Sequence, residues 1–208
     1  MKSAIEGANH WRRSLLGLGS VALMALVLAL AAVLGLIEAE IAAEGCIALL
    51  ALAGIFHGLV RFGVSTRFAD ADFVAAQVTA AFVLLAWLTY RAAGASSVIP
   101  VLYLVAMLYG TLQLDRARLA IITMLAAVTH GTALFMLIDD GYRINHAAAW
   151  TQFGALVLAL AWFTFAAGFV LRLRARLSAA HRRLHDLELE ASERASREVL
   201  SLPMHPLL

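Results

Sequence analysis

Long apolar stretches, separated by short polar ones, run through most of this chain. Six of them are long enough to cross the core of a bilayer, which takes about 20 residues of helix; they cover residues 15–37, 41–60, 73–90, 98–114, 119–138 and 147–171. Their residues do not alternate in polarity, as the strands of a membrane barrel do. A lone spanning segment satisfies its backbone hydrogen bonds only as a helix. The pattern therefore predicts an all-α membrane protein, a six-transmembrane helix bundle over residues 15–171.

The positions of the basic residues predict how these helices are oriented. Cytoplasmic loops of membrane proteins carry an excess of Lys and Arg. If the N-terminal segment, residues 1–14, is cytoplasmic, then Arg91 and Arg143 are the only two of the 16 Lys and Arg residues on the outer side. The outer loops hold carboxylates instead, at Glu38, Glu40, Glu44, Asp139 and Asp140. We therefore expect a multi-pass protein with both termini in the cytoplasm.

Composition supports this interpretation and narrows the functions that fit. The chain is 62% hydrophobic and 14% charged, whereas soluble domains are about 25% charged. Its mean hydropathy is +0.85. The residues outside the six helices are too few for a sizeable soluble catalytic domain. Cys46 is the single cysteine, which excludes an internal disulfide and a multi-cysteine metal site. We expect the bilayer as a partner, no nucleic acid and no cofactor.

The last 37 residues differ from the rest, because they are charged and contain no glycine or proline before Pro203. Apolar residues recur there at alternating steps of four and three, which is the seam of a coiled coil. The spacing predicts a cytoplasmic coiled-coil helix over 172–202 and a parallel homodimer through Leu177, Leu184 and Leu187. A four-residue step later in the seam is a stutter, which locally unwinds a coiled coil. The alternative is an amphipathic helix that lies on the membrane surface.

This layout resembles the membrane sensor region of bacterial diguanylate cyclases that carry a GGDEF domain. The loop from Arg61 to Asp70, with Gly63, Arg67 and Phe68, is similar to the connection between the second and third helices of some of these sensors, although Ala71 stands where they often have proline. The tail 203–208, with the residues just before it, resembles a degraded start of the GGDEF domain.

The resemblance implies a sensor module of the bacterial inner membrane in cyclic di-GMP signalling, without its output domain. Similar modules precede histidine kinases. No nucleotide-binding signature and no catalytic residue of such a domain is present in the sequence. Whether the protein takes part in an enzyme is left open, and no catalytic site is predicted.

Five side chains in the predicted helices are candidates for ligand contact or sensing: His57, Tyr109, Gln113, His130 and Trp162. Ionisable groups inside a membrane are costly and are functional candidates, and imidazole titrates near neutral pH. The two histidines are expected at depths that differ by roughly 8 Å, at 1.5 Å per residue of helix. That offset argues against a shared metal or haem, so no metal site is predicted. Interhelical hydrogen bonding and packing are the structural alternative.

The remaining membrane features favour packing or anchoring. Trp162, with the neighbouring phenylalanines and two tyrosines of the fourth stretch, would form a pocket for a small apolar or amphiphilic ligand. Gly54 and Gly58 are spaced for close helix approach. Trp87 and Tyr90 are typical interfacial anchors, and the two adjacent aspartates at 139 and 140 are interpreted as a solvated loop.

Two kinds of function therefore stand against each other. The first is a sensor whose tail helix carries a signal to a cytoplasmic cyclase or kinase domain. The second is a small permease or channel-like bundle, with a water-accessible path lined by His57, Gln113 and His130. The absence of paired carboxylates within the apolar stretches weighs against an ion-coupled transporter.

Overall fold

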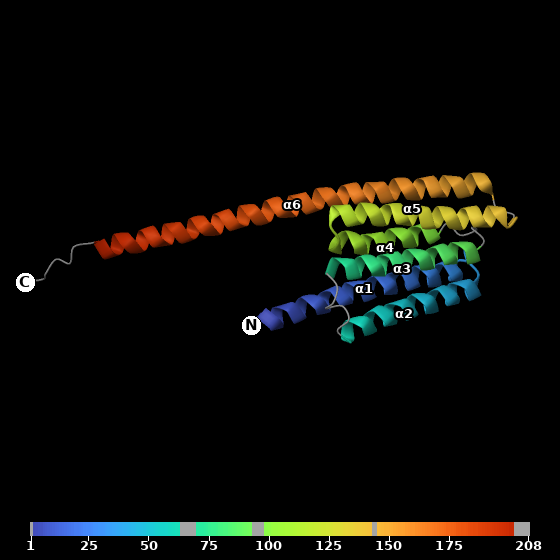
Figure 1. Cartoon of the computed structure of the whole chain (residues 1–208), viewed down its shortest axis with the longest axis horizontal. Helices are drawn as coiled ribbons and strands as arrows, with labels where there is room; N and C mark the ends of the chain where they lie inside the picture. Colours follow the sequence, from blue (N-terminus) through green and yellow to red (C-terminus); the bar gives the residue numbers. More distant parts are fainter. Residues whose placement is uncertain (1, 63–69, 93–97, 143–144, 202–208) are drawn as a thin grey trace, which may run out of the picture. The chain divides into compact units, whose positions relative to one another are not determined.

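The computed structural model describes an all-helical chain (Figure 1). It describes the backbone of residues 2–62, 70–92, 98–142 and 145–201, and the side chains of 17–62, 71–92, 98–142, 145–173, 176–181 and 183. Within these residues the chain forms no strand, and its helices are α1 (Lys2–Val33), α2 (Ala39–Arg61), α3 (Asp70–Arg91), α4 (Ile99–Gln113), α5 (Arg116–Asp139) and α6 (His146–Ser201).

Each of the six apolar stretches corresponds to a helix, and four of the described helical segments have the length and apolarity needed to cross a membrane. These are Ala39–Arg61, Ala71–Arg91, Arg116–Asp139 and His146–His181. α1 has 32 residues, and its side chains are described from Gly17 on; the described part, Gly17–Val33, has 17 residues. α4, Ile99–Gln113, has 15 residues. At 1.5 Å per residue, α4 is about 22 Å long, less than the ~30 Å of a hydrocarbon core. The prediction of six full-length spans therefore holds for four helices by this measure.

Local chemistry explains where α1 and α4 end. α1 stops at Val33, before the predicted limit of 37, and Gly35 adopts a positive φ of 69° in the turn that follows. Glycine takes this left-handed conformation without the steric cost of a Cβ atom. α4 ends as Leu114 turns extended, and the Asp115 carboxylate then caps α5 by accepting from the backbone N–H of Arg118 at 2.8 Å.

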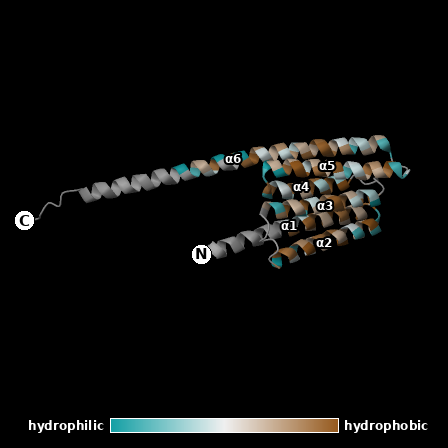
Figure 2. Ribbon diagram, viewed as in Figure 1, coloured by the Kyte–Doolittle hydropathy of each residue, from teal (hydrophilic) through white to brown (hydrophobic). Residues whose placement is uncertain are grey.

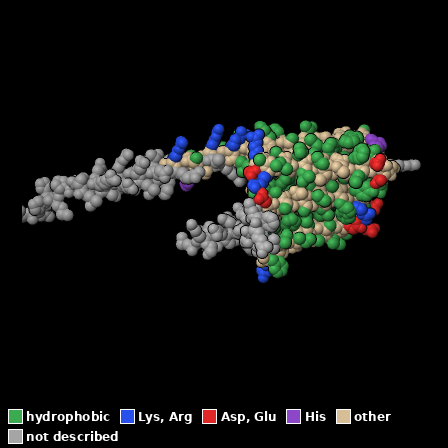
Figure 3. Space-filling model, viewed as in Figure 1, with side chains coloured by type: hydrophobic (Ala, Val, Ile, Leu, Met, Phe, Trp, Pro, Cys, Tyr) green, Lys and Arg blue, Asp and Glu red, His purple; other side chains and the backbone are tan. Residues whose placement is uncertain are grey.

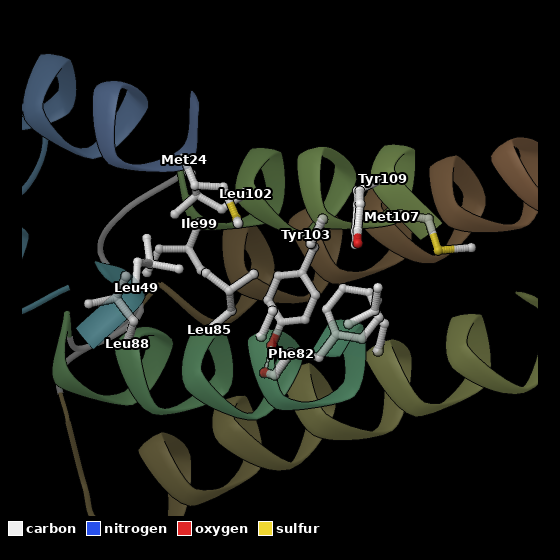
Figure 4. Packing of buried hydrophobic residues seen from close by; sticks show 14 of the residues in the cluster. Met24, Leu49, Phe82, Leu85, Leu88, Ile99, Leu102, Tyr103, Met107 and Tyr109 are labelled. Carbon is white, nitrogen blue, oxygen red and sulfur yellow. Dashed lines mark hydrogen bonds between the residues drawn. The ribbon is translucent and has the colours of Figure 1, made fainter. Parts of the chain in front are cut away.

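α3 lies at the centre of the bundle, where it packs against α2, α4 and α5, while α1 packs against α2 and α4. The core between these helices is a continuous set of buried apolar side chains (Figure 4). Its largest members include Leu49, Phe82, Leu85, Leu88, Leu102, Tyr103 and Met107.

The outside of the bundle is also largely apolar. Large hydrophobic side chains are exposed on every helix, and Figure 2 shows that polar residues are concentrated near the helix ends. Figure 3 shows the same division on one face, with acidic and basic side chains at the two ends and hydrophobic ones between them. Soluble proteins rarely expose contiguous apolar surface of this kind. The described helices thus have the exterior of a membrane protein.

α6 is a single helix of 56 residues. Its start is capped by Asn145, whose side-chain oxygen accepts from the backbone N–H of Ala148 at 3.1 Å. The chain divides into two compact units between Ala167 and Gly168. In the second unit Arg172 Nε donates to the carbonyl of Gly168 at 3.1 Å, and Leu177 is 62% exposed. The side chains of Leu184 and Leu187, predicted in the same seam, lie outside the described residues.

Candidate functional site

His130 lies in the interior of the bundle on α5 and is 3% exposed. Its Nδ1 atom is 3.4 Å from the hydroxyl of Thr89 on α3, and that hydroxyl donates to the carbonyl of Leu85 at 2.8 Å. A hydroxyl has a single proton to donate. The Thr89 proton is donated to the Leu85 carbonyl, so the hydrogen bond with His130 forms when Nδ1 of His130 carries a proton and donates it to the Thr89 oxygen.

Aromatic rings enclose the imidazole of His130. Tyr103 on α4 meets it edge to face at 5.1 Å, and Phe153 on α6 stacks on it at 6.1 Å. Tyr103 also stacks on Phe82 at 5.3 Å and donates its hydroxyl to the Phe82 carbonyl at 3.3 Å. His130 therefore joins four helices through ring packing, and this cluster leaves the imidazole little access to a ligand.

Tyr109 is also buried, in a second polar contact that links α4 to α3. Its hydroxyl donates to Gln77 Oε1 at 3.1 Å. A Cβ atom built on Gly17 of α1 would lie 3.2 Å from Gln77 Nε2 and 3.3 Å from the Tyr109 oxygen, so Gly17 packs closely against this pair. A cavity of about 20 Å³ lies beside this pair and is also lined by Ser20. It has room for little more than one water molecule.

The other predicted candidates lie elsewhere. His57 is exposed on α2, Gln113 is half-buried at the end of α4, and Trp162 is 68% exposed on α6. α2 packs against α1 and α3, whereas α5 packs against α3 and α4, so His57 and His130 are on helices that share no contact. The structure thus does not bring the five candidates together. Trp162 and Phe165 are exposed, whereas Phe163 packs against the core and Tyr103 and Tyr109 are buried.

A larger feature that the sequence did not reveal is the groove between α3 and α5, hereafter the α3–α5 groove. Its volume is about 580 Å³. The residues that line it are Val83, Ala86, Trp87, Tyr90, Val128, Thr129, Thr132, Ala133, Met136, Asp139 and Asp140. A sequence signal was present, because Trp87 and Tyr90 are spaced to share one face of α3. The pattern alone did not show that this face opens beside α5.

Polar groups close one end of the α3–α5 groove. The hydroxyl of Tyr90 donates to Asp140 Oδ2 at 2.7 Å, and its ring meets Tyr142 edge to face at 6.1 Å. Asp139 stands next to Asp140 in the same wall. The two aspartates predicted as a solvated loop are exposed, as expected, and they also form the acidic end of a mainly apolar groove.

Ion pairs fix both ends of α3. One end of the bundle is acidic and carries Glu38, Glu40, Glu44, Asp139 and Asp140. At this end Arg91 donates two hydrogen bonds to the Glu44 carboxylate, from Nη2 at 3.0 Å and from Nε at 3.2 Å. At the opposite end, Arg118 on α5 lies 2.7 Å from Asp72 and 2.9 Å from Asp115. These pairs are partly exposed, so their main effect is on register and orientation rather than stability.

A threonine pair connects α5 to α6. The hydroxyls of Thr123 and Thr164 are 2.6 Å apart, and each is also within hydrogen-bond distance of the carbonyl four residues earlier in its own helix. Since each hydroxyl has one proton, one threonine donates within its helix and the other donates across to its partner.

Comparison of the chain with models of protein families, with curated proteins and with solved structures finds no match. Among the described residues no group of three or more His, Cys, Asp or Glu side chains is placed to hold a metal ion. The described residues thus form a helical bundle with a sizeable groove between α3 and α5.

Proposed function

We propose that the chain is a sensor and signal-transduction module of the bacterial inner membrane, with six membrane-crossing helices and both termini in the cytoplasm. The proposal includes the likeness to the membrane region of diguanylate cyclases and a role in cyclic di-GMP signalling. One observation carries it. α6 is a single helix from His146 to Ser201, apolar as far as residue 171 and charged beyond it. Such a helix is suited to pass a rotation or a shift from the bilayer to the cytoplasm.

The surroundings of α4 support counting it as a span despite its length. Seven of its 15 residues are buried, and its exposed residues form one narrow strip of Val101, Leu108 and Leu112. A helix that meets protein on most sides does not need to match the thickness of the lipid. The chain also reverses direction at both ends of α4, as a spanning helix requires (Figure 1).

The small number of outer basic residues supports the proposed orientation. Arg91 is one of the two that the orientation places outside, against 14 inside. Its guanidinium is held by both carboxylate oxygens of Glu44.

The permease alternative is supported less well. It needs a polar path lined by His57, Gln113 and His130, but the imidazole of His130 is enclosed by rings and α2 does not contact α5. The described residues provide no continuous set of polar side chains through the bundle along these three positions.

Disulfide crosslinking in native membranes tests the proposal. Cys46 is first replaced by alanine, and single cysteines are then introduced as Leu184→Cys on the predicted seam and Arg182→Cys on the opposite face of the same helix. In a parallel coiled coil the two copies of residue 184 approach each other. We expect L184C to form a dimer upon mild oxidation and R182C to remain monomeric.

Two results would count against the proposal. If L184C stays monomeric in native membranes, the tail is not a dimeric coil and has no symmetric partner to signal through. If L184C and R182C crosslink equally, the contact is collisional. In both cases the tail is better described as a helix bound to the membrane surface.

A further inference from the structure

We propose that the α3–α5 groove binds a small single-chain amphiphile with a cationic head group. This inference deepens the proposed function by naming a ligand class for the sensor. It rests on the proposed function for one point only, that the acidic end of the bundle faces the outside. Binding in the groove is a separate property and can be measured separately.

The shape of the groove suits one extended chain. Its volume of about 580 Å³ lies within the range of small-molecule sites, about 300–1,000 Å³. Along α5 its wall extends from Val128 to Asp139, a rise of about 16 Å at 1.5 Å per residue. Val83 and Trp87 on α3 face Val128 and Met136 on α5 across this length, so the long walls are apolar.

The charge of the groove selects a cation. Asp139 and Asp140 close one end, and the described residues that line the groove include no lysine, arginine or histidine. The Tyr90 hydroxyl holds Asp140 from the side at 2.7 Å and so fixes one carboxylate in the wall. An ammonium group there gains charge-assisted hydrogen bonds or contacts at the edge of a low-dielectric region, where such interactions are stronger than in water.

Aromatic rings add a second, independent reason to favour a cation. Trp87 and Tyr90 line the groove on successive turns of α3, close to the acidic end. Cations are attracted to the faces of indole and phenol rings. Carboxylates and ring faces both repel an anionic head group, so an alkyl sulfate of the same length is expected to be rejected.

Quenching of Trp87 fluorescence measures binding directly. Trp11, Trp150 and Trp162 are replaced by phenylalanine, and the protein is reconstituted in phosphatidylcholine vesicles. Bromodecyltrimethylammonium is the probe, because its bromine quenches a neighbouring indole. We expect saturable quenching with this cation, and only the weak, non-saturating quenching of partition into the bilayer with bromodecyl sulfate and bromodecanol.

Matched variants separate the groove from the surface charge. Replacing both wall carboxylates, as D139N/D140N, is expected to raise the half-saturating concentration about ten-fold or more, because the attraction between the carboxylates and the quaternary ammonium is lost. The control E38Q/E40Q removes the same charge from the same end of the bundle, outside the groove, and is expected to change it less than two-fold. Ala86→Leu keeps every charge but narrows the groove, and should weaken binding as well.

Several outcomes would overturn the inference. Quenching that is equal for the cation and the sulfate, or equal in D139N/D140N and E38Q/E40Q, would show that only the bilayer takes up the probe. Competition by added phosphatidylethanolamine would make a membrane lipid the occupant. Crosslinking of Val83→Cys between two copies would make the groove a protein interface. Far-UV circular dichroism of each variant confirms that it is folded.

The test also separates this inference from the proposed function. If the probe fails to saturate but L184C still crosslinks, the groove is not the ligand site and the sensor proposal stands. If the probe saturates but L184C stays monomeric, the site stands and the dimeric signalling tail does not. If the probe changes the rate of L184C crosslinking, the groove and the tail are coupled.

Discussion

At the scale of single residues, the bundle gives its buried polar groups partners on neighbouring helices. Among the described residues no buried side-chain nitrogen or oxygen lacks a hydrogen-bond partner. An unsatisfied polar group costs several kcal/mol in lipid, where no water replaces the missing partner. The contacts of Thr89 with His130, of Tyr109 with Gln77 and of Thr123 with Thr164 therefore determine which helices can adjoin one another.

His130→Ala is the sharpest residue-scale test of this packing role. The substitution removes the ring contacts with Tyr103 and Phe153 and leaves a cavity between four helices, so we expect a loss of about 2–4 kcal/mol in the free energy of unfolding. His130→Phe keeps a ring in place and should lose less. Unfolding by sodium dodecyl sulfate from mixed micelles, followed by circular dichroism, measures both variants.

His57→Ala provides the control for His130. Because the His57 side chain is exposed on α2, its removal should cost less stability than removal of the buried His130. Equal losses for His57→Ala and His130→Ala would contradict the packing role assigned to the aromatic cluster.

The candidate site could be predicted only in part from single residues. Sequence hydropathy identifies His130 and Tyr109 as polar groups within apolar stretches, but not which of them is enclosed. The α3–α5 groove depends on which faces two helices turn toward each other, and nothing in the local pattern around Trp87 or Asp139 encodes that choice. The exposure of Trp162 has the same origin, because the apolar pattern of α6 does not show which of its faces meets the other helices.

At the scale of elements, glycine position shows how much depends on helix rotation. Gly54 and Gly58 have the spacing of a close-packing motif, but a Cβ atom at either would meet nothing within 4 Å. A Cβ atom at Gly45, on another face of the same helix, would lie 3.1 Å from Leu28 of α1 and 3.2 Å from Leu88 of α3. The spacing rule identified the right helix but the wrong face for contacts within one chain.

Gly45→Leu and Gly54→Leu form a matched pair that tests this assignment. Both substitutions gain about 1 kcal/mol of helix propensity. At Gly45 the new side chain collides with two leucines, and overpacking costs about 1–3 kcal/mol, so a net loss of stability is expected. At Gly54 it should be neutral or stabilising. Thermal unfolding in the same detergent compares the stability of the two variants. If Gly54→Leu alone loses stability, the face of α2 that carries Gly54 packs against a second chain.

Helix boundaries were largely predictable, because charged residues and turns delimit the apolar stretches on both sides. The described helices begin and end within a few residues of the predicted limits, with α1 as the exception. It begins at Lys2, well before the predicted residue 15, and ends at Val33, four residues before the predicted residue 37. α4 matches the fourth stretch in position but is too short to count as a span by length. Hydropathy does not determine whether a helix faces lipid or protein, so it could not show that α4 is largely enclosed by its neighbours.

At the scale of the whole molecule, the exterior of the bundle agrees with the proposed membrane placement. Apolar side chains cover the sides of the helices (Figure 3). The acidic end of the bundle is opposite the end at which α2 and α4 have their C-termini (Figure 1). The number of crossings decides on which side each loop emerges. Three helices separate Phe62 from Tyr142, so six spans place these residues on opposite sides.

Labelling from outside intact cells tests that count. In the C46A background, Tyr142→Cys should react with a membrane-impermeant maleimide, and Phe62→Cys should react only after the membrane is permeabilised. Both native side chains are exposed, at 44% and 85%, so neither cysteine is expected to be protected by packing. If both react from the same side, α4 does not cross the bilayer, and the orientation proposed for the termini would have to be revised.

The enclosure of α4 has a consequence for how the protein is made. A 15-residue helix alone in lipid would leave its ends within the hydrocarbon or force the bilayer to thin around it, each at a cost that grows with the mismatch. Surrounded by α1, α3 and α5, the same helix is covered by protein. α4 is therefore expected to become stably inserted only after α5 has been synthesised, so that the middle of the chain enters the membrane together with its neighbours and not in strict order of translation.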